Sequence, residues 1–155
     1  MTGNPKKPQD FMGLAFETAE AAALRGEVPV GAIIVDFVSG EILATAGNEV
    51  ETSDDPTAHA EMLAIRAAAA KVGESRLTGC DLYVTLEPCP MCAAAISFAR
   101  LRRVIFGAYD PKGGGVDHGP RIFTQPTCHH RPEVVGGVDA SRSEVLLKGF
   151  FGARR

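Results

Sequence analysis

The chain has 155 residues, of which 45% are hydrophobic and 23% are charged, and its formal net charge is −3. These values are typical of a globular domain with its own core, so we expect a single domain over 1–155 with a disordered polar segment over 1–9. The net negative charge excludes a protein that binds nucleic acid through an overall basic surface, and we expect no DNA partner. Any contact with nucleic acid would need local positive patches.

The apolar runs are too short to cross a membrane, because none approaches the ~20 residues that a spanning helix needs. The polar N-terminal segment lacks the apolar core of a signal peptide. The four cysteines are more typical of a reducing compartment than of a disulfide framework, because two of them form a Cys-x-x-Cys pair. We therefore expect a cytoplasmic protein without membrane contact.

Short apolar runs alternate with segments of helical periodicity, separated by glycine and proline turns. Helices are predicted at about 10–26, 55–71, 89–99 and 141–151, and strands at 30–35, 42–46, 81–85, 103–106 and 133–135. Asp55 is the expected N-cap of the second helix, with Pro56 in its first position, and Ser141 and Glu144 resemble a capping box for the last helix. Since there is no internal repeat and no linker, this alternation predicts an α/β fold whose helices cover both faces of a sheet.

Two separate segments carry residues that can bind a metal. His59-Ala60-Glu61 lies at the start of the second predicted helix, and Pro88-Cys89-Pro90-Met91-Cys92 lies at the start of the third. One imidazole and two thiolates suit Zn²⁺, and a fourth position left to water is the arrangement of a catalytic zinc site. We therefore predict one Zn²⁺, held by His59, Cys89 and Cys92.

Glu61 is the predicted catalytic residue, because a carboxylate beside the metal is free to move protons. It can take a proton from the activated water, pass it to a ring nitrogen of an amidine-like base, and later protonate the departing amine. The start of a helix favours negative charge, which lowers the pKa of both cysteine thiols. His-x-Glu followed by Pro-Cys-x-x-Cys is the known signature of zinc-dependent nucleobase deaminases.

Each half of this pattern alone has a simpler explanation. Cys-x-x-Cys could be a redox pair or half of a structural zinc knuckle, and a glutamate at a helix start also interacts well with the helix dipole. A structural zinc site would need a fourth protein ligand. The candidates for that ligand are Cys80, Cys128, His129 and His130, although a buried thiol at Cys80 and a packed loop at 128–130 are the plainer interpretations.

Further segments resemble those of the bacterial tRNA-specific adenosine deaminases, over about residues 10 to 155. These segments are Glu27-Val28-Pro29-Val30-Gly31-Ala32, Asn48, Asp55-Pro56-Thr57-Ala58-His59-Ala60-Glu61, Leu82-Tyr83-Val84-Thr85-Leu86-Glu87-Pro88-Cys89, Phe106-Gly107-Ala108, Phe150-Phe151 and Arg154-Arg155. The resemblance implies a cytidine-deaminase-like three-layer α/β/α sandwich around a mixed five-stranded sheet, and a homodimer. It also implies zinc-dependent conversion of adenosine to inosine at the wobble position of a tRNA anticodon.

The resemblance further implies a set of residues that bind the anticodon stem-loop. They are Asn48 on the target nucleoside, Val30, Ala60 and Pro88 in the pocket wall, Asp110 beside the neighbouring nucleotide, and Phe150, Phe151 and Arg154 against loop nucleotides. Without the resemblance, Asn48 and Asp110 are equally well explained as turn residues, and packing of the last helix would account for the two phenylalanines.

Two other functions stay open, because related deaminases share the residues at the metal. The chain could deaminate a free base or nucleoside, such as guanine, cytosine or cytidine, or it could be a non-enzymatic structural zinc domain. The C-terminal Phe-Phe and Arg-Arg pairs favour the tRNA enzyme. The sequence departs from the family at Tyr109 and over 113–128, which leaves the identity of the tRNA open.

Overall fold

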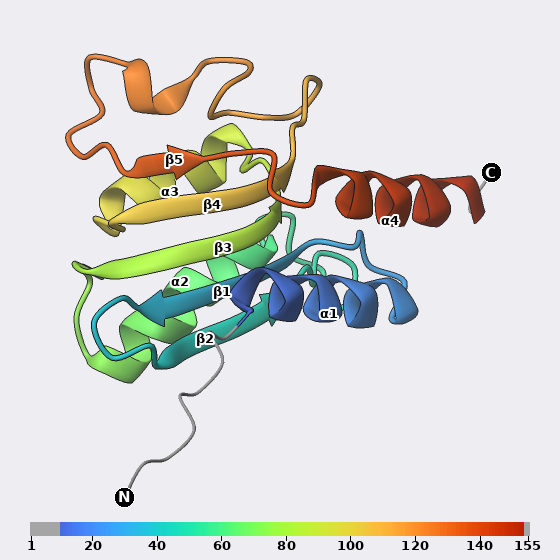
Figure 1. The fold of residues 1–155 in the computed structure, drawn as a ribbon, viewed down its shortest axis with the longest axis horizontal. Coiled ribbons are helices and arrows are strands. Elements are labelled where there is room, and N and C mark those ends of the chain that lie inside the picture. Colours follow the sequence, from blue (N-terminus) through green and yellow to red (C-terminus); the bar gives the residue numbers. More distant parts are fainter. Residues whose placement is uncertain (1–9, 154–155) are drawn as a thin grey trace, which may run out of the picture.

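A computed structural model describes residues 10–153 of the chain. A five-stranded sheet lies between two layers of helices (Figure 1), so the predicted three-layer α/β/α sandwich is confirmed. The expected disorder over 1–9 and the predicted role of Arg154 concern positions outside the described residues. None of the helices within 10–153 is long and apolar enough to cross a membrane.

The strands follow the predicted positions closely. They are β1 (Gly31–Asp36), β2 (Ile42–Gly47), β3 (Cys80–Leu86), β4 (Arg103–Ala108) and β5 (Glu133–Val135). Their order across the sheet is β2-β1-β3-β4-β5. β1 pairs with β2 and β3 in the antiparallel sense, while the β3–β4 and β4–β5 pairs are parallel, so the sheet is mixed as expected.

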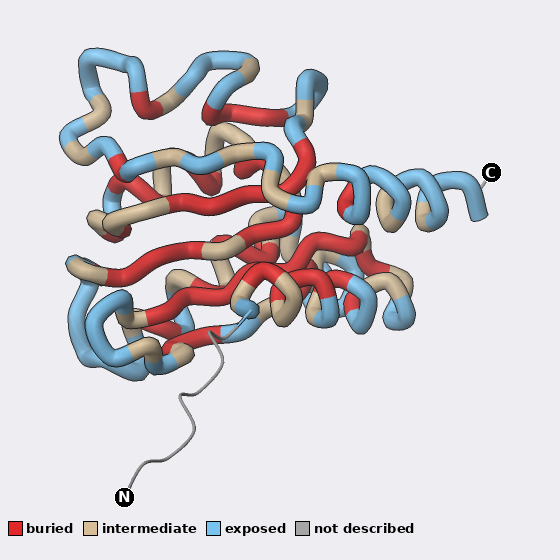
Figure 2. The backbone as a smooth tube through the Cα atoms, in the orientation of Figure 1, coloured by how far each residue is buried: buried red, intermediate tan, exposed pale blue. Residues whose placement is uncertain are grey.

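Helices cover both faces of this sheet. α1 (Phe11–Leu24) and α4 (Ala140–Ala153) lie in front of it in Figure 1, and α2 (Ala60–Val72) and α3 (Pro90–Phe98) lie behind it. Each layer encloses an apolar cluster against the sheet. The central strands are therefore buried along most of their length, whereas much of α4 is exposed (Figure 2). Burial on both faces explains why β1 has a nearly continuous apolar sequence.

The second helix begins later than the sequence predicts. The Asp55 carboxylate accepts hydrogen bonds from both the backbone N–H and the hydroxyl of Thr57, each at 2.8 Å. Such side-chain bonds stabilise a turn in competition with helix. α2 therefore begins at Ala60 and not at Pro56, and its N-cap is His59, whose backbone is extended.

The predicted capping box of the last helix is also wrong. α4 begins at Ala140, so Ser141 lies inside its first turn and cannot be the N-cap. The backbone carbonyl of Asp139 instead accepts the N–H groups of Arg142 and Ser143. Asp139 has a φ of 52°, and the chain enters the helix through this left-handed residue. A sequence pattern for capping does not reveal such a backbone turn.

Candidate active site

The two predicted metal-binding segments meet at the starts of α2 and α3. His59 is the N-cap of α2, and Cys89 is the N-cap of α3. Pro90 in the first position of α3 presets the helical backbone. The helical turn then brings Cys92 beside Cys89, whose Sγ accepts the backbone N–H of Cys92 at 3.5 Å.

The distances between the three side chains suit a zinc ion. The Nδ1 atom of His59 lies 3.5 Å from the Sγ of Cys89 and 3.6 Å from the Sγ of Cys92. Zinc bound tetrahedrally at the usual Zn–N and Zn–S lengths would separate these ligand atoms by about 3.6 Å. Within residues 10–153 these three side chains form the one group of at least three such residues with atoms close enough to share a metal.

The alternative fourth ligands lie in other environments. Cys80 is buried at the start of β3. The Sγ of Cys128 lies 3.4 Å from the hydroxyl of Ser97 and 3.2 Å from the carbonyl of His130. The Nε2 of His130 binds the carbonyl of Leu101 at 2.6 Å. Three ligands and an open fourth position are typical of a catalytic zinc and not of a structural one.

The two cysteines differ strongly in acidity. A hydrogen bond from the Cys92 thiol, followed by one from His59, lowers the pKa of Cys89 to about 4. The bond to the ionised Cys89 and the burial of its own thiol raise the pKa of Cys92. A thiolate is therefore ready to bind a cation at neutral pH, and a cation would favour loss of the second proton.

Glu61 lies in the first turn of α2 and is 4% exposed. Burial raises the pKa of its carboxyl to about 7. A group with this pKa can both take and release a proton near neutral pH, which suits an acid–base catalyst. Glu61 also lines a pocket that contains His59 and Cys89.

This pocket has a volume of about 520 Å³ and opens to solvent beside the end of α4. The structure brings together on its lining five of the residues predicted to bind substrate: Val30, Asn48, Asp110, Phe150 and Phe151. Ala60 and Pro88 are not part of the lining, because Ala60 is packed in the core and Pro88 is buried. Hence the structure places five of the seven described candidates at the pocket.

No motif of the sequence marks Glu27 as functional, although its carboxylate anchors part of the pocket lining. Its carboxylate accepts the backbone N–H groups of Glu51 and Thr52 at 3.1 and 2.6 Å, and the Thr52 hydroxyl at 2.5 Å. It also accepts the side-chain N–H of Asn48 at 3.5 Å. Burial raises the pKa of Glu27, but the bonds from Thr52 and Glu51 outweigh it and leave the pKa below its usual value.

Glu87, directly after β3, also lines the pocket, and no motif of the sequence marks it as functional. Its side chain is fully buried and accepts five hydrogen bonds from the segment 110–118. Burial raises the pKa of Glu87, but the N–H of Asp110 and the ring of His118 lead the bonds that bring it below its usual value. A glutamate beside an otherwise apolar strand is the sequence feature that could have indicated both anchors.

Comparison with known proteins places this geometry in a family. The family described as the cytidine and deoxycytidylate deaminase zinc-binding region matches residues 5–108. That range includes all three candidate metal ligands and Glu61. A protein of Agrobacterium fabrum named tRNA-specific adenosine deaminase is 53% identical, over 94% of each chain.

Solved structures also match this chain to deaminases. A structure from a study of A-to-I editing by tRNA:A34 deaminases at the wobble position superposes with a TM-score of 0.85 and 54% identity, covering 88% of this chain and 98% of the other. The guanine deaminase of Bacillus subtilis superposes with a TM-score of 0.61 and 44% identity, covering 64% of this chain and 62% of the other. The tRNA-editing structure thus matches more of the chain.

Proposed function

We propose that this protein, which belongs to the tRNA-specific adenosine deaminases within the cytidine and deoxycytidylate deaminase family, converts adenosine to inosine at position 34 of a tRNA anticodon. The observation that carries the proposal is the pocket lined by His59, Cys89 and the buried Glu61, where Cys92 completes the group of three candidate metal ligands. The reaction is hydrolytic: water replaces the amino group on the purine ring, and ammonia leaves.

His59, Cys89 and Cys92 hold the zinc in this proposal, because their atoms already have tetrahedral spacing. Bound zinc supplies a Lewis acid that acidifies water for attack on the ring carbon. At the start of α3 the backbone N–H of Cys92 donates to the Sγ of Cys89, which favours the ionised form of that thiol.

Glu61 moves the protons. Its carboxylate takes a proton from the attacking water and gives it to a ring nitrogen, which makes the attacked carbon more electrophilic. The regenerated carboxylate then takes the second proton of that water, from the hydroxyl now on the ring carbon, and gives it to the amino group, which leaves as ammonia. The burial of Glu61 supports this role, because it brings the pKa of the carboxyl to about 7.

The base to be deaminated enters the pocket in an unstacked conformation. An unpaired base of an anticodon loop costs less to extrude than a base within a duplex. We assign Asn48 to a hydrogen bond with the nucleoside, Val30 to the apolar wall, and Asp110, Phe150 and Phe151 to the neighbouring loop nucleotides, because all of them line the pocket.

We also propose that the protein is a homodimer and acts in the cytoplasm, where tRNA is its partner. An exposed aromatic ring supports a self-association surface: Phe98 on α3 is 75% exposed and borders a groove of about 150 Å³. The ring and the groove together form a contiguous apolar surface, and contiguous exposed apolar surfaces mark interaction sites.

A substrate panel tests the proposed function. Purified zinc-loaded protein is incubated with an anticodon stem-loop that has adenosine at position 34, with a matched stem-loop that has guanosine there and adenosine elsewhere in the loop, and with free guanine and cytidine. We expect inosine in the first RNA alone. Turnover of guanine or cytidine without inosine in the RNA would instead favour the free-base deaminase, and no turnover of any substrate would favour a structural zinc domain.

A further inference from the structure

The segment 110–118 has both of its ends fixed to one buried carboxylate. The Oε1 atom of Glu87 accepts the backbone N–H of Asp110 at 3.0 Å, at the start of the segment. The Oε2 atom accepts the N–H groups of Val116, Asp117 and His118 at 3.2, 3.0 and 3.2 Å, at its end. Because an ionised carboxylate can only accept hydrogen bonds, all of its contacts with these donors are favourable.

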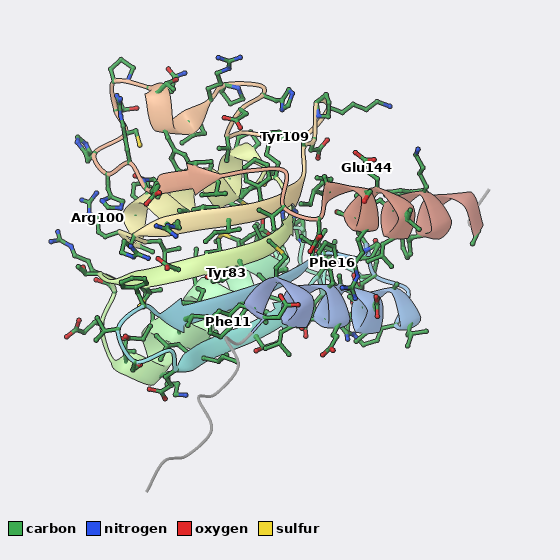
Figure 3. The ribbon with its side chains drawn as sticks, in the orientation of Figure 1. Phe11, Phe16, Tyr83, Arg100, Tyr109 and Glu144 are labelled. Carbon is green, nitrogen blue, oxygen red and sulfur yellow. The ribbon has the colours of Figure 1, made fainter. Side chains whose placement is uncertain are left out.

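His118 adds the one side-chain bond that the segment makes to this carboxylate among the described contacts. Its Nδ1 lies 2.7 Å from the Oε1 of Glu87, so the ring donates through Nδ1. The ring is partly exposed, and its edge faces Tyr109, whose position after β4 is visible in Figure 3. The ring of Tyr109 in turn contacts Phe106 edge-on.

The segment also fits closely against the metal-binding turn. A Cβ atom on Gly114 would collide with the Glu87 carboxylate and with the backbone of Asp110. A Cβ atom on Gly115 would lie 2.5 Å from the backbone N of Pro90, which begins α3. The N–H of Gly115 donates to the carbonyl of Pro88 at 2.8 Å. The segment therefore has little freedom to shift relative to the metal ligands.

Two residues of this segment line the pocket, namely Asp110 and Gly113. The Asp110 side chain accepts the N–H groups of Lys112 and Gly113 at 3.2 and 3.0 Å, so the turn that holds it is itself fixed. We infer that Glu87 and His118 form a clamp that positions Asp110 at the mouth of the pocket and thereby sets the affinity for the RNA. The inference rests on the proposed function and adds two positioning residues to it.

A double-mutant cycle tests the clamp through its effect on Asp110. The variants are His118→Ala, Asp110→Ala and both together, with His118→Asn as a conservative variant whose amide can still donate to Glu87. Loss of one hydrogen bond to a charged group should raise KM for the stem-loop about tenfold in His118→Ala and leave kcat within about twofold, because Glu61 and the metal ligands are untouched. His129→Ala, an exposed histidine on another loop, is the matched control.

The clamp predicts that the double variant has the same KM for the stem-loop as Asp110→Ala alone. It also predicts that His118→Asn keeps most of the wild-type affinity for the RNA. Additive effects of the two substitutions would overturn it, because independent residues contribute independently. A KM of His118→Asn for the stem-loop as high as that of His118→Ala would also overturn the clamp. An equal rise of KM in the His129→Ala control would overturn it as well.

Backbone hydrogen exchange tests the clamp without any RNA. In zinc-loaded His118→Ala the amides of 110–118 should exchange faster than in the wild type, while those of β1 and β3 stay unchanged. Unchanged exchange at 110–118 would overturn the clamp. If wild-type protein makes no inosine but the exchange result holds, the proposed function and the effect on RNA affinity fail, while the positioning of Asp110 by Glu87 and His118 stands.

Discussion

Three buried glutamates around the pocket differ in acidity because they differ in hydrogen-bond donors. Burial dominates at Glu61 and raises its pKa to about 7, whereas the N–H groups around Glu27 and Glu87 keep the pKa of each below its usual value. Surroundings of this kind separate a carboxyl that exchanges protons from one that stays ionised. Glu61 therefore suits catalysis, and the other two suit structural anchoring.

The anchor at Glu27 makes a prediction about stability and pH. Its folded pKa lies below the unfolded value of 4.5, so its stabilising contribution is complete above that value and is lost as the pH falls through the folded pKa. Glu27→Gln should lower the free energy of unfolding at pH 7 by about 1–3 kcal/mol, because its N–H donors lose an ionised acceptor.

Urea unfolding of the zinc-loaded proteins at several pH values checks this expectation. The difference between wild type and Glu27→Gln should shrink below about pH 4.5, as the wild-type carboxyl takes up a proton. Glu74→Gln, at an exposed position after α2, should unfold like the wild type throughout. A difference that stays constant between pH 7 and pH 4 would contradict the ionised anchor.

At the scale of elements, the sequence predicts the strands and helices well and their starts less well. Apolar runs and helical periodicity identify every strand and α-helix that the structure describes. The starts of α2 and α4 are wrong because local contacts override the capping pattern: Asp55 binds Thr57, and Asp139 adopts a left-handed backbone. The later start of α2 has a chemical consequence, since it leaves His59 as the N-cap.

The grouping of the candidate metal ligands and Glu61 could be predicted because two short motifs contain all of them. The contacts of the two anchors could not be predicted, since Glu27 contacts Thr52 and Glu87 contacts His118, and such pairs are brought together by the fold. Pocket lining was predicted only in part for the same reason: side chains that are close in sequence, such as those of Ala60 and Glu61, point to different sides of a helix.

At the scale of the whole molecule, the basic run at 100–103 does not serve the pocket. Arg102 forms a bidentate pair with Asp81, and Arg103 pairs with Glu133. Arg100 lies at the end of the sheet away from α4 (Figure 3). The described lining of the pocket contains five carboxylates and no lysine or arginine, so it suits a base and not a phosphate.

Self-association is the second property of the whole molecule that can be tested. If Phe98 lies in the interface of the proposed homodimer, Phe98→Asp should shift the sedimenting species from about twice the chain mass of 16.3 kDa to that of a single chain. Val145→Asp, on exposed α4, is the control and should leave the dimer intact. A wild-type protein that sediments as a monomer at micromolar concentration would contradict the dimer.

Inosine formation by Glu61→Gln, measured beside the wild type at equal zinc content, tests most directly whether this pocket deaminates RNA as proposed. The substitution keeps the size of the side chain but removes the group that transfers protons. We expect full zinc binding and an unchanged fold, with the rate on the position-34 stem-loop lowered by about 10²–10⁴-fold. A Glu61→Gln protein that forms inosine at the wild-type rate would contradict the assignment of Glu61 and the mechanism built on it.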